Sequence, residues 1–247
     1  MADHQHSEKV LSGSIIRTVF ALAIPVTLGM LMQVALSLTD FYWVGKLGAA
    51  AQDAITSSMV IIWTVFSAIS IITIGITALV ARYVGARDFD LTRFFIRQSV
   101  WLTLGLGTVV ALVGYVYTPA CLAFMDTGPA TLSFAIPYLR VFFVATLFLM
   151  FYETIFAVFR ASGDTRTPMK IGILVVVVNM VLDPIFIFGI GPIPALGVMG
   201  ASLATSISYV LGAGLAFRAL YGGALDFPLG PLFRAKPDLA AMTKIAR

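Results

Sequence analysis

The sequence is short of charge and nearly devoid of the side chains that most catalytic sites use. Charged residues make up 11% of the 247 residues, whereas soluble domains carry about 25%. The single cysteine, Cys121, excludes a disulfide within the chain, and the two histidines, His4 and His6, lie in a polar N-terminal tail. Cysteine and histidine therefore form no metal-ligand spacing. These absences argue against a soluble globular domain and against a membrane-embedded enzyme.

Further absences narrow the classes of function. The phosphate-binding pattern GxxxxGK[ST] does not occur, so ATP coupling is not encoded in these residues. The net charge of +4 would suit nucleic acid, but the charges fall between long apolar runs, and we expect no nucleic-acid partner. The first apolar run is too long for a signal-peptide core and no small-residue cleavage site precedes it, so no signal peptide is expected.

Long apolar runs dominate what is present. Apolar residues make up 60% of the chain and its mean hydropathy is +0.98. A membrane-spanning helix needs about 20 apolar residues, and the runs are too long and continuous for the strands of a β-barrel. The sequence predicts an all-α, polytopic membrane protein whose six-helix bundle occupies 15–220. The six expected spans are 15–43, 54–81, 95–118, 131–159, 168–190 and 196–217.

The basic residues predict the orientation of these spans. Fourteen of the 16 lysines and arginines lie before the first span or at its start, in or beside the gaps after the second and fourth spans, or after the sixth. Only Lys46 lies in a gap on the other side, and Arg140 lies inside the fourth span. Since basic residues accumulate on the cytoplasmic side, both termini are expected there. The tail 1–14 and the polar stretch 221–247 are then cytoplasmic.

Two local patterns predict how the spans pack and turn. Small residues let helices approach closely in lipid, and the sixth span carries them at every fourth position. Between the fourth and fifth spans, Gly163 suits a left-handed helix end. Thr167 is expected to cap the fifth span, with Pro168 as its first residue. The small residues of the sixth span are Gly200, Ala204, Ser208, Gly212 and Ala216.

Two aspartates lie where aspartate is costly. Asp40 closes a charge-free run of 22 residues, 18–39, and Asp183 lies between two charge-free stretches, 171–182 and 184–217. A lone carboxylate in a lipid-buried helix costs several kcal/mol on some scales, so such residues mark ion or substrate paths. For Asp40, the alternative is an interfacial residue solvated from outside.

Further polar residues fall at similar depth. Asn179 lies four residues before Asp183 and shares its helix face. At a rise of about 1.5 Å per residue, Asp40, Asn179, Asp183, Tyr138 and Thr205 all lie within about 16 Å of the outer membrane edge. We expect one shared cavity in the outer half of the bundle.

The chemistry of such a cavity follows from its carboxylates. Two carboxylates close together in a low-dielectric site do not both stay ionised, and they titrate as a unit. The site would exchange a proton for a cation. The oxygens of Asp40, Asn179, Asp183 and Thr205 would alternatively ligate Na⁺, a hard cation. A site that holds either the coupling ion or a cationic substrate is the minimum machinery of an antiporter.

Four motifs together resemble the multidrug and toxic compound extrusion (MATE) family, over about residues 12 to 245. Each motif alone is weak, but their order and spacing are specific. They are Asp40 followed by 44–48 (VGKLG), then 85–87 (GAR), then 160–168 (RASGDTRTP), then Asn179 and Asp183 followed by 197–205 (GVMGASLAT).

The resemblance implies a twelve-helix fold of two six-helix lobes, of which this chain matches the N-terminal lobe. In the branch with Asp in the first helix and Asn and Asp in the fifth, the proton or Na⁺ site lies in this lobe. Asp40, Asn179, Asp183 and Tyr138 match that pattern, and Thr205 is a further match to it. Residues 221–247 would be the linker to a second lobe, and the chain would be truncated before it. The alternative is a half-transporter that dimerises.

The expected function is efflux of cationic or amphipathic organic compounds across the cell membrane, in exchange for H⁺ or Na⁺, by alternating access. No cofactor and no enzymatic activity are expected. Gln33, Tyr138 and Arg140 are expected to line the substrate cavity, although a structural role is the alternative for Arg140 and for Glu153. A flippase for lipids or lipid-linked precursors is the second function that this superfamily allows, and it would be expected to carry more basic residues in its cleft.

Overall fold

The computed structural model describes residues 15–125, 128–223, 225, 227–232 and 236–246. Six of the helices in this part are long and apolar enough to cross a membrane, which confirms the predicted all-α membrane fold. His4 and His6 lie outside the described residues. The helices are α2 (Ile15–Gly45), α3 (Ala49–Gly85), α4 (Phe89–Phe124), α5 (Pro129–Ala161), α6 (Arg166–Phe188), α7 (Val198–Tyr221) and the short α8 (Leu239–Ala246).

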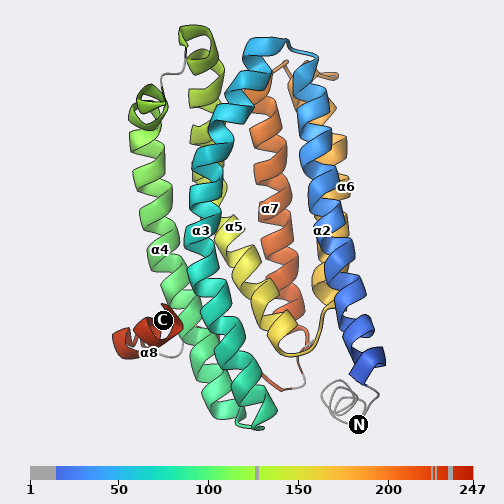
Figure 1. Cartoon of the computed structure of the whole chain (residues 1–247), viewed down its shortest axis with the longest axis vertical. Helices are drawn as coiled ribbons and strands as arrows, with labels where there is room; N and C mark the ends of the chain where they lie inside the picture. The colour runs from blue at the N-terminus through green and yellow to red at the C-terminus, as the bar shows by residue number, and fades with distance from the viewer. Residues whose placement is uncertain (1–14, 126–127, 224, 226, 233–235, 247) are drawn as a thin grey trace.

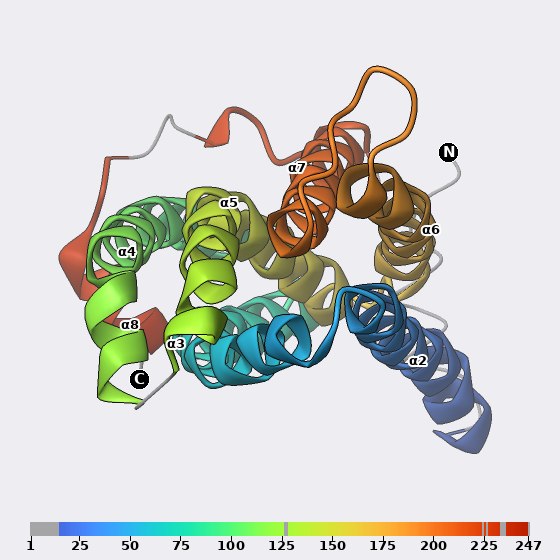
Figure 2. The same ribbon diagram turned by 90° about the horizontal axis from the view of Figure 1, so that it is seen from above.

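Helix α5 is the core of the bundle. It packs against α3, α4 and α7, while α6 packs against α7 and α2, and Figure 2 shows α5 enclosed by its neighbours. In the apolar stretch with which α5 could cross a membrane, 72% is buried inside the bundle, whereas the corresponding share for α2 is 11%. The apolar character of α5 therefore serves protein packing, whereas that of α2 leaves much of its surface uncovered. Arg82, Arg160 and Arg218 lie in the last turns of α3, α5 and α7, and we call this end of the bundle the basic end.

Several helices extend beyond their predicted apolar spans. Helix α3 runs to Gly85 and α4 begins at Phe89, although the spans were expected to end at 81 and begin at 95. Backbone hydrogen bonding continues through the polar turns because their side chains can reach solvent, and the Asp88 carboxylate caps α4 by accepting from Leu91 N at 3.0 Å. Apolar length thus marks the membrane crossing but not the helix end.

The turn between α5 and α6 follows the prediction at one end only. Gly163 adopts a positive φ of 88° two residues after the end of α5, as expected. The expected Thr167 cap is wrong, because α6 begins at Arg166 and it is Asp164 that accepts from the backbone N–H groups of Arg166 and Thr167, both at 3.0 Å. An ionised carboxylate outcompetes a threonine hydroxyl at a helix N-terminus because it also interacts with the helix dipole.

The small residues of α7 lie in the helix interface, as predicted. A Cβ atom added at Gly212 would lie 2.7 Å from Val175 Cγ2 and 2.8 Å from Tyr152 Cε2. At Gly200, an added Cβ would overlap the carbonyl group of Phe186 and lie 2.9 Å from Ile187 N. Glycine at these two positions therefore sets how closely α7 approaches α6 and α5.

The C-terminal segment is attached to the outside of α3 and α4, where Figure 1 shows α8 lying across them. The buried Gln98 side chain holds the segment from both sides, donating to Lys236 O at 2.9 Å and accepting from Asp238 N at 2.9 Å. Gly75 of α3 lies against the backbone carbonyl of Ile245, so closely that a Cβ atom would overlap it. The segment that was expected to be a linker thus has a defined docking position on this lobe.

Replacing Gly75 with valine is expected to release α8 from α3, because the new side chain occupies the space of the Ile245 carbonyl. Hydrogen exchange followed by mass spectrometry should show the amide protection of 239–246 falling by about tenfold or more. Gly105→Val is the matched control, since no atom lies within 4 Å of an added Cβ on that helix position of α4. Unchanged protection in Gly75→Val would contradict this docking.

Candidate functional site

Four of the predicted residues meet where α2, α6 and α7 pack, in the half of the bundle opposite the basic end. Asp40 projects from α2, Asn179 and Asp183 from α6, and Thr205 from α7. Asn179 and Asp183 are fully buried, and Asp40 is half-buried. We call these four residues the acidic site. The structure therefore brings together residues separated by up to 165 positions in the sequence.

Asn179 is the centre of the acidic site. With its amide nitrogen turned toward the carboxyl groups, Nδ2 donates to Asp40 Oδ1 at 3.2 Å and to Asp183 Oδ2 at 3.3 Å. The amide oxygen then accepts from the backbone N–H of Thr205 at 3.1 Å and from its hydroxyl at 3.0 Å. This orientation satisfies every group around the amide, and the hydrogen-bond network is what assigns an amide's orientation.

The two carboxyl groups are also direct neighbours. Asp40 and Asp183 lie within hydrogen-bonding reach of each other. A hydrogen bond between two carboxyl groups requires a proton on one of them, because an ionised carboxylate only accepts. In the described part of the chain, the enclosed Oδ1 atom of Asp183 receives no hydrogen bond from a protein donor. The acidic site thus has more acceptors than protein donors, and a proton or a small cation would fill the deficit.

Of the residues predicted for the substrate cavity, Tyr138 lies beside the acidic site. Its ring packs on a cluster that includes Val44, Ile187 and Val198, and its phenol interacts electrostatically with both aspartates. The α5 backbone is held to α7 at this level, because the Ser202 hydroxyl donates to Tyr138 O at 2.7 Å.

Gln33 contacts a residue that the sequence did not single out. Its Nε2 atom donates to the hydroxyl of Tyr209 at 3.0 Å, across α2 and α7. Tyr209 is buried, 6% exposed, and lies four residues after Thr205 on the same helix face. That spacing from Thr205 is the signal that would have identified it.

Arg140 lies apart from these groups. Its side chain is exposed, and its guanidinium lies 5.3 Å from the centroid of the Tyr115 ring on α4. Although Arg140 and Tyr138 are close in sequence, they lie on different faces of α5, and the structure does not bring Arg140 to the acidic site. Its predicted place in the substrate cavity receives no support from this geometry.

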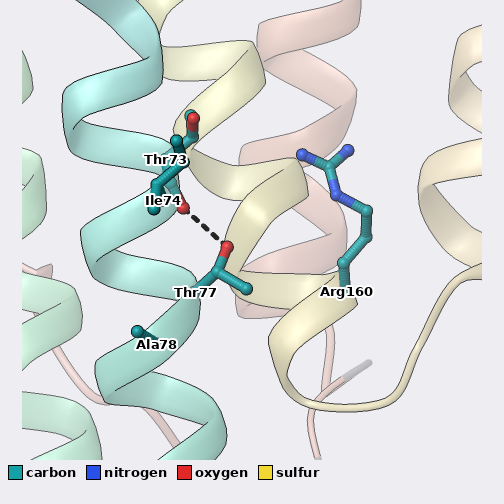
Figure 3. A pocket seen from close by; sticks show the side chains of 5 residues that line it. All are labelled: Thr73, Ile74, Thr77, Ala78 and Arg160. Carbon is teal, nitrogen blue, oxygen red and sulfur yellow. Dashed lines mark hydrogen bonds between the residues drawn. The ribbon is translucent and has the colours of Figure 1, made fainter.

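Two pockets open near the basic end instead. One, of about 400 Å³, lies between α3 and α5 and is shown in Figure 3 with Arg160, Thr73 and Thr77 on its walls. The other, of about 620 Å³, lies between α6 and α7 and includes Lys170 and Arg218. Neither pocket contains a residue of the acidic site.

The donor set of the acidic site consists of two carboxyl groups, one amide and one hydroxyl. Among the described residues, no three or more His, Cys, Asp or Glu side chains gather as metal ligands. Carboxylate, amide and hydroxyl groups remain, and their oxygens suit a hard cation or a proton.

The chain is similar to known transporters over most of its length. It is 31% identical over 211 residues to the probable multidrug resistance protein YpnP of Bacillus subtilis, covering 85% of this chain and 45% of that protein. It is 26% identical over 202 residues to a FAD transporter of Shewanella oneidensis, covering 82% of this chain and 45% of that protein. The chain thus spans about half the length of these relatives.

A solved structure shares the fold. A MOP superfamily transporter from Pyrococcus furiosus superposes with a TM-score of 0.89 at 24% identity, covering 99% of this chain and 53% of that one. The MatE family model matches residues 25–185, which include Gln33, Asp40, Asn179 and Asp183. The chain is a multi-pass membrane protein, and it belongs to the MatE family.

Proposed function

We propose that this chain is the ion-coupling lobe of a secondary antiporter that exports organic compounds in exchange for protons. The observation that supports this most strongly is the contact between Asp40 and Asp183, with a buried Oδ1 atom of Asp183 that receives no hydrogen bond from the described residues. A carboxyl pair of this kind holds one proton between two acceptors. Binding and release of that proton would change the charge of a buried site by one unit.

The orientation of Asn179 favours a proton over Na⁺ as the coupling ion. With Nδ2 toward the carboxyl groups, the amide acts as a donor to them and offers no oxygen to a metal ion. To ligate Na⁺, the amide would have to turn its oxygen to the carboxyl groups, and Nδ2 would then donate to Thr205 Oγ1 at 3.0 Å. The Asn179 amide makes hydrogen bonds in both orientations. Na⁺ coupling is therefore the second candidate, and the Na⁺ site would differ from the proton site by one rotation of this amide.

Exchange requires that proton and cargo exclude one another. When the carboxyl pair loses its proton, it carries an additional negative charge that is costly in a dry bundle. A cationic compound entering the cavity would neutralise that charge, whereas a bound proton removes the attraction. Each ligand then lowers the affinity for the other by the same factor, because the coupling is reciprocal.

The cavity is completed by a second lobe in this proposal, which the remainder of a longer polypeptide or a second copy of this chain would supply. The relatives are about twice as long as the matched region. Helices α2 and α3 leave large apolar side chains uncovered, as a lobe interface or a lipid contact would require. On α2 these include Val19, Phe20, Leu31, Val34 and Leu38.

The proposed cargo is a cationic or amphipathic organic compound, because the polar groups that converge in the bundle are acidic and phenolic. One relative is named a multidrug resistance protein, and another is named a FAD transporter. An anionic cargo such as FAD, or a lipid-linked precursor as in a flippase, would need basic groups in the cavity. The arginine of the central helix that was predicted there, Arg140, faces away.

Proteoliposomes that contain the purified protein test this proposal. We expect a pH gradient alone to drive efflux of a fluorescent organic cation, whereas a Na⁺ gradient alone drives none. The same vesicles loaded with FAD provide the anionic arm. Efflux with a Na⁺ gradient only would replace the proton by Na⁺, and FAD transport without cation transport would contradict the proposed cargo.

A further inference from the structure

The larger of the two pockets at the basic end has no part in the acidic site, and we call it the α6–α7 pocket. Its charged lining residues are Lys170 of α6 and Arg218 of α7, and both side chains are exposed. No acidic residue lines the pocket, and neither cation forms an ion pair within the described part of the chain. The Asp164 carboxylate in the preceding turn is engaged in capping α6. The pocket therefore carries two positive charges without a counter-ion from these residues.

The other walls of the α6–α7 pocket are polar on the outer side and apolar on the inner side. Thr167 lies in the first turn of α6, while Gly222 and Gly223 follow the end of α7. Ile171 and Leu215 line the pocket one turn deeper in the bundle. An anionic group held by the two cations would thus have a hydroxyl and backbone beside it, and apolar side chains on its inner side.

An exposed apolar stripe continues from this pocket along both helices. On α6 its members follow Lys170 at spacings of four and three residues, and on α7 they precede Leu215 at spacings of four, so each set keeps to one helix face. Figure 2 shows α6 and α7 side by side at one edge of the bundle. Because both helices are apolar enough to cross a membrane, this stripe would contact hydrocarbon chains. It consists of Leu174, Val177 and Val181 on α6 and of Leu211 and Ile207 on α7.

The position of the α6–α7 pocket indicates which anion fits it. Lys170 lies four residues after the first residue of α6, and Arg218 lies three residues before the last residue of α7. Phospholipid head groups occupy the level at which membrane-crossing helices end, and basic pockets between such helices bind anionic head groups. A soluble anion would neutralise the cations but leave the apolar stripe without a ligand. A zwitterionic lipid would bring a third positive charge to the pocket, whereas a lipid of net negative charge would not.

We propose that the α6–α7 pocket binds the phosphate of a phospholipid that carries a net negative charge. Lys170 and Arg218 would hold the phosphate, and the acyl chains would lie on the exposed stripe of α6 and α7. The bound phosphate would link the two helices that carry Asn179, Asp183 and Thr205. This inference does not depend on which ion or cargo the protein transports.

Native mass spectrometry of the purified chain in detergent, titrated with phosphatidylglycerol or phosphatidylcholine, tests the proposal. We expect the wild type to retain phosphatidylglycerol in preference to phosphatidylcholine. Lys170→Gln and Arg218→Gln should each lower the affinity for phosphatidylglycerol by about fivefold, the factor that one basic residue contributes near anionic lipid, and leave phosphatidylcholine binding unchanged. Arg82→Gln is the matched control, since Arg82 is an exposed arginine at the same end of the bundle that does not line the pocket.

Two further measurements separate a lipid site from general surface charge and from a site for soluble phosphate. Ala219→Phe fills the pocket while both cations stay in place, so it should weaken phosphatidylglycerol binding at least as much as the loss of one cation. An excess of glycerol phosphate, which lacks acyl chains, should not displace the lipid.

Several outcomes would overturn the proposal. They are equal retention of the two lipids by the wild type, equal losses in Arg82→Gln and Arg218→Gln, wild-type binding in a folded Ala219→Phe variant, and displacement of the lipid by glycerol phosphate. Should Ala219→Phe not fold, the variants at the exposed Lys170 and Arg218 still decide. All of these measurements report binding, so their failure leaves the proton antiport standing, and a failure of the antiport leaves them unchanged.

Discussion

Asp183→Asn is expected to abolish pH-driven efflux and to leave the fold at least as stable as the wild type. The amide has the shape of the carboxyl group, so it still fills the space between Asn179 and Asp40, but it cannot bind and release a proton. Efflux under a pH gradient should fall to the level of protein-free vesicles.

Asp183→Asn is expected to be at least as stable as the wild type because it removes the free-energy cost of burying a carboxylate. Transfer of an aspartate to the middle of a membrane helix costs about 2.5–3.5 kcal/mol on insertion scales. At Asp183 the protein offsets part of this cost through Asn179, while Oδ1 receives no protein donor in the described part of the chain. Replacing the carboxylate with a neutral amide removes that cost. Loss of function together with equal or higher stability would separate a coupling residue from a structural one.

Asp40→Asn provides the comparison within the same site. Asp40 is half-buried on α2, so its removal is expected to change stability less than that of Asp183 while stopping pH-driven efflux equally. The measurements are apparent melting temperature in detergent and efflux from proteoliposomes at matched protein amounts. If both variants still transport at wild-type rates, the carboxyl pair is not the coupling site. If Asp183→Asn unfolds at a much lower temperature, its role is structural.

The residues of the acidic site could be predicted because each is unusual within its own helix. Asp40 and Asp183 interrupt long charge-free runs, and Asn179 shares the face of Asp183 at one helical turn. The depth of each residue along its span then predicted that all of them lie in the outer half of the membrane. The contact between them, however, depends on how α2 packs against α6, and no local pattern in either helix specifies that packing.

No comparable signal in the sequence predicts the other contacts of the structure. A tyrosine in an apolar span is common, and what distinguishes Tyr209 is the contact of its hydroxyl with Gln33 of another helix. Arg140 was expected in the cavity because charge inside a span is rare, but the side chain lies over Tyr115 on the outer surface. A helical position in the sequence gives the depth of a residue, whereas its direction depends on the rotation of the helix. The docking of α8 on α3 is likewise a contact between distant segments.

Gly200→Ala is expected to destabilise the protein, although helix propensity alone predicts the opposite. In a helix interior, alanine is more favourable than glycine by about 1 kcal/mol. At Gly200, however, the new methyl group would overlap the Phe186 carbonyl and lie 2.9 Å from Ile187 N, and these are backbone atoms of α6 that cannot rotate away. Overpacking of this kind costs about 1–3 kcal/mol, and occasionally more. The steric effect should therefore exceed the gain in propensity.

Gly214→Ala is the matched control on the same helix. Gly214 is exposed, and no atom lies within 4 Å of its added Cβ, so this substitution should keep or raise the apparent melting temperature, as propensity predicts. Opposite signs for two identical substitutions in α7 would show that the close approach of α6 and α7 is set by Gly200. An equal effect at both positions would contradict it.

The same substitution connects packing to transport. Phe186 and Ile187 follow Asp183 by three and four residues on α6, so a shift of this turn away from α7 would also move Asp183 relative to Thr205. Gly200→Ala is therefore expected to lower pH-driven efflux more than its effect on the amount of folded protein explains, whereas Gly214→Ala leaves efflux unchanged. Efflux that falls only in proportion to folded protein would show that the acidic site tolerates displacement of α6. The hydrogen bonds of Asn179, rather than the helix contact at Gly200, would then be what holds the two carboxyl groups together.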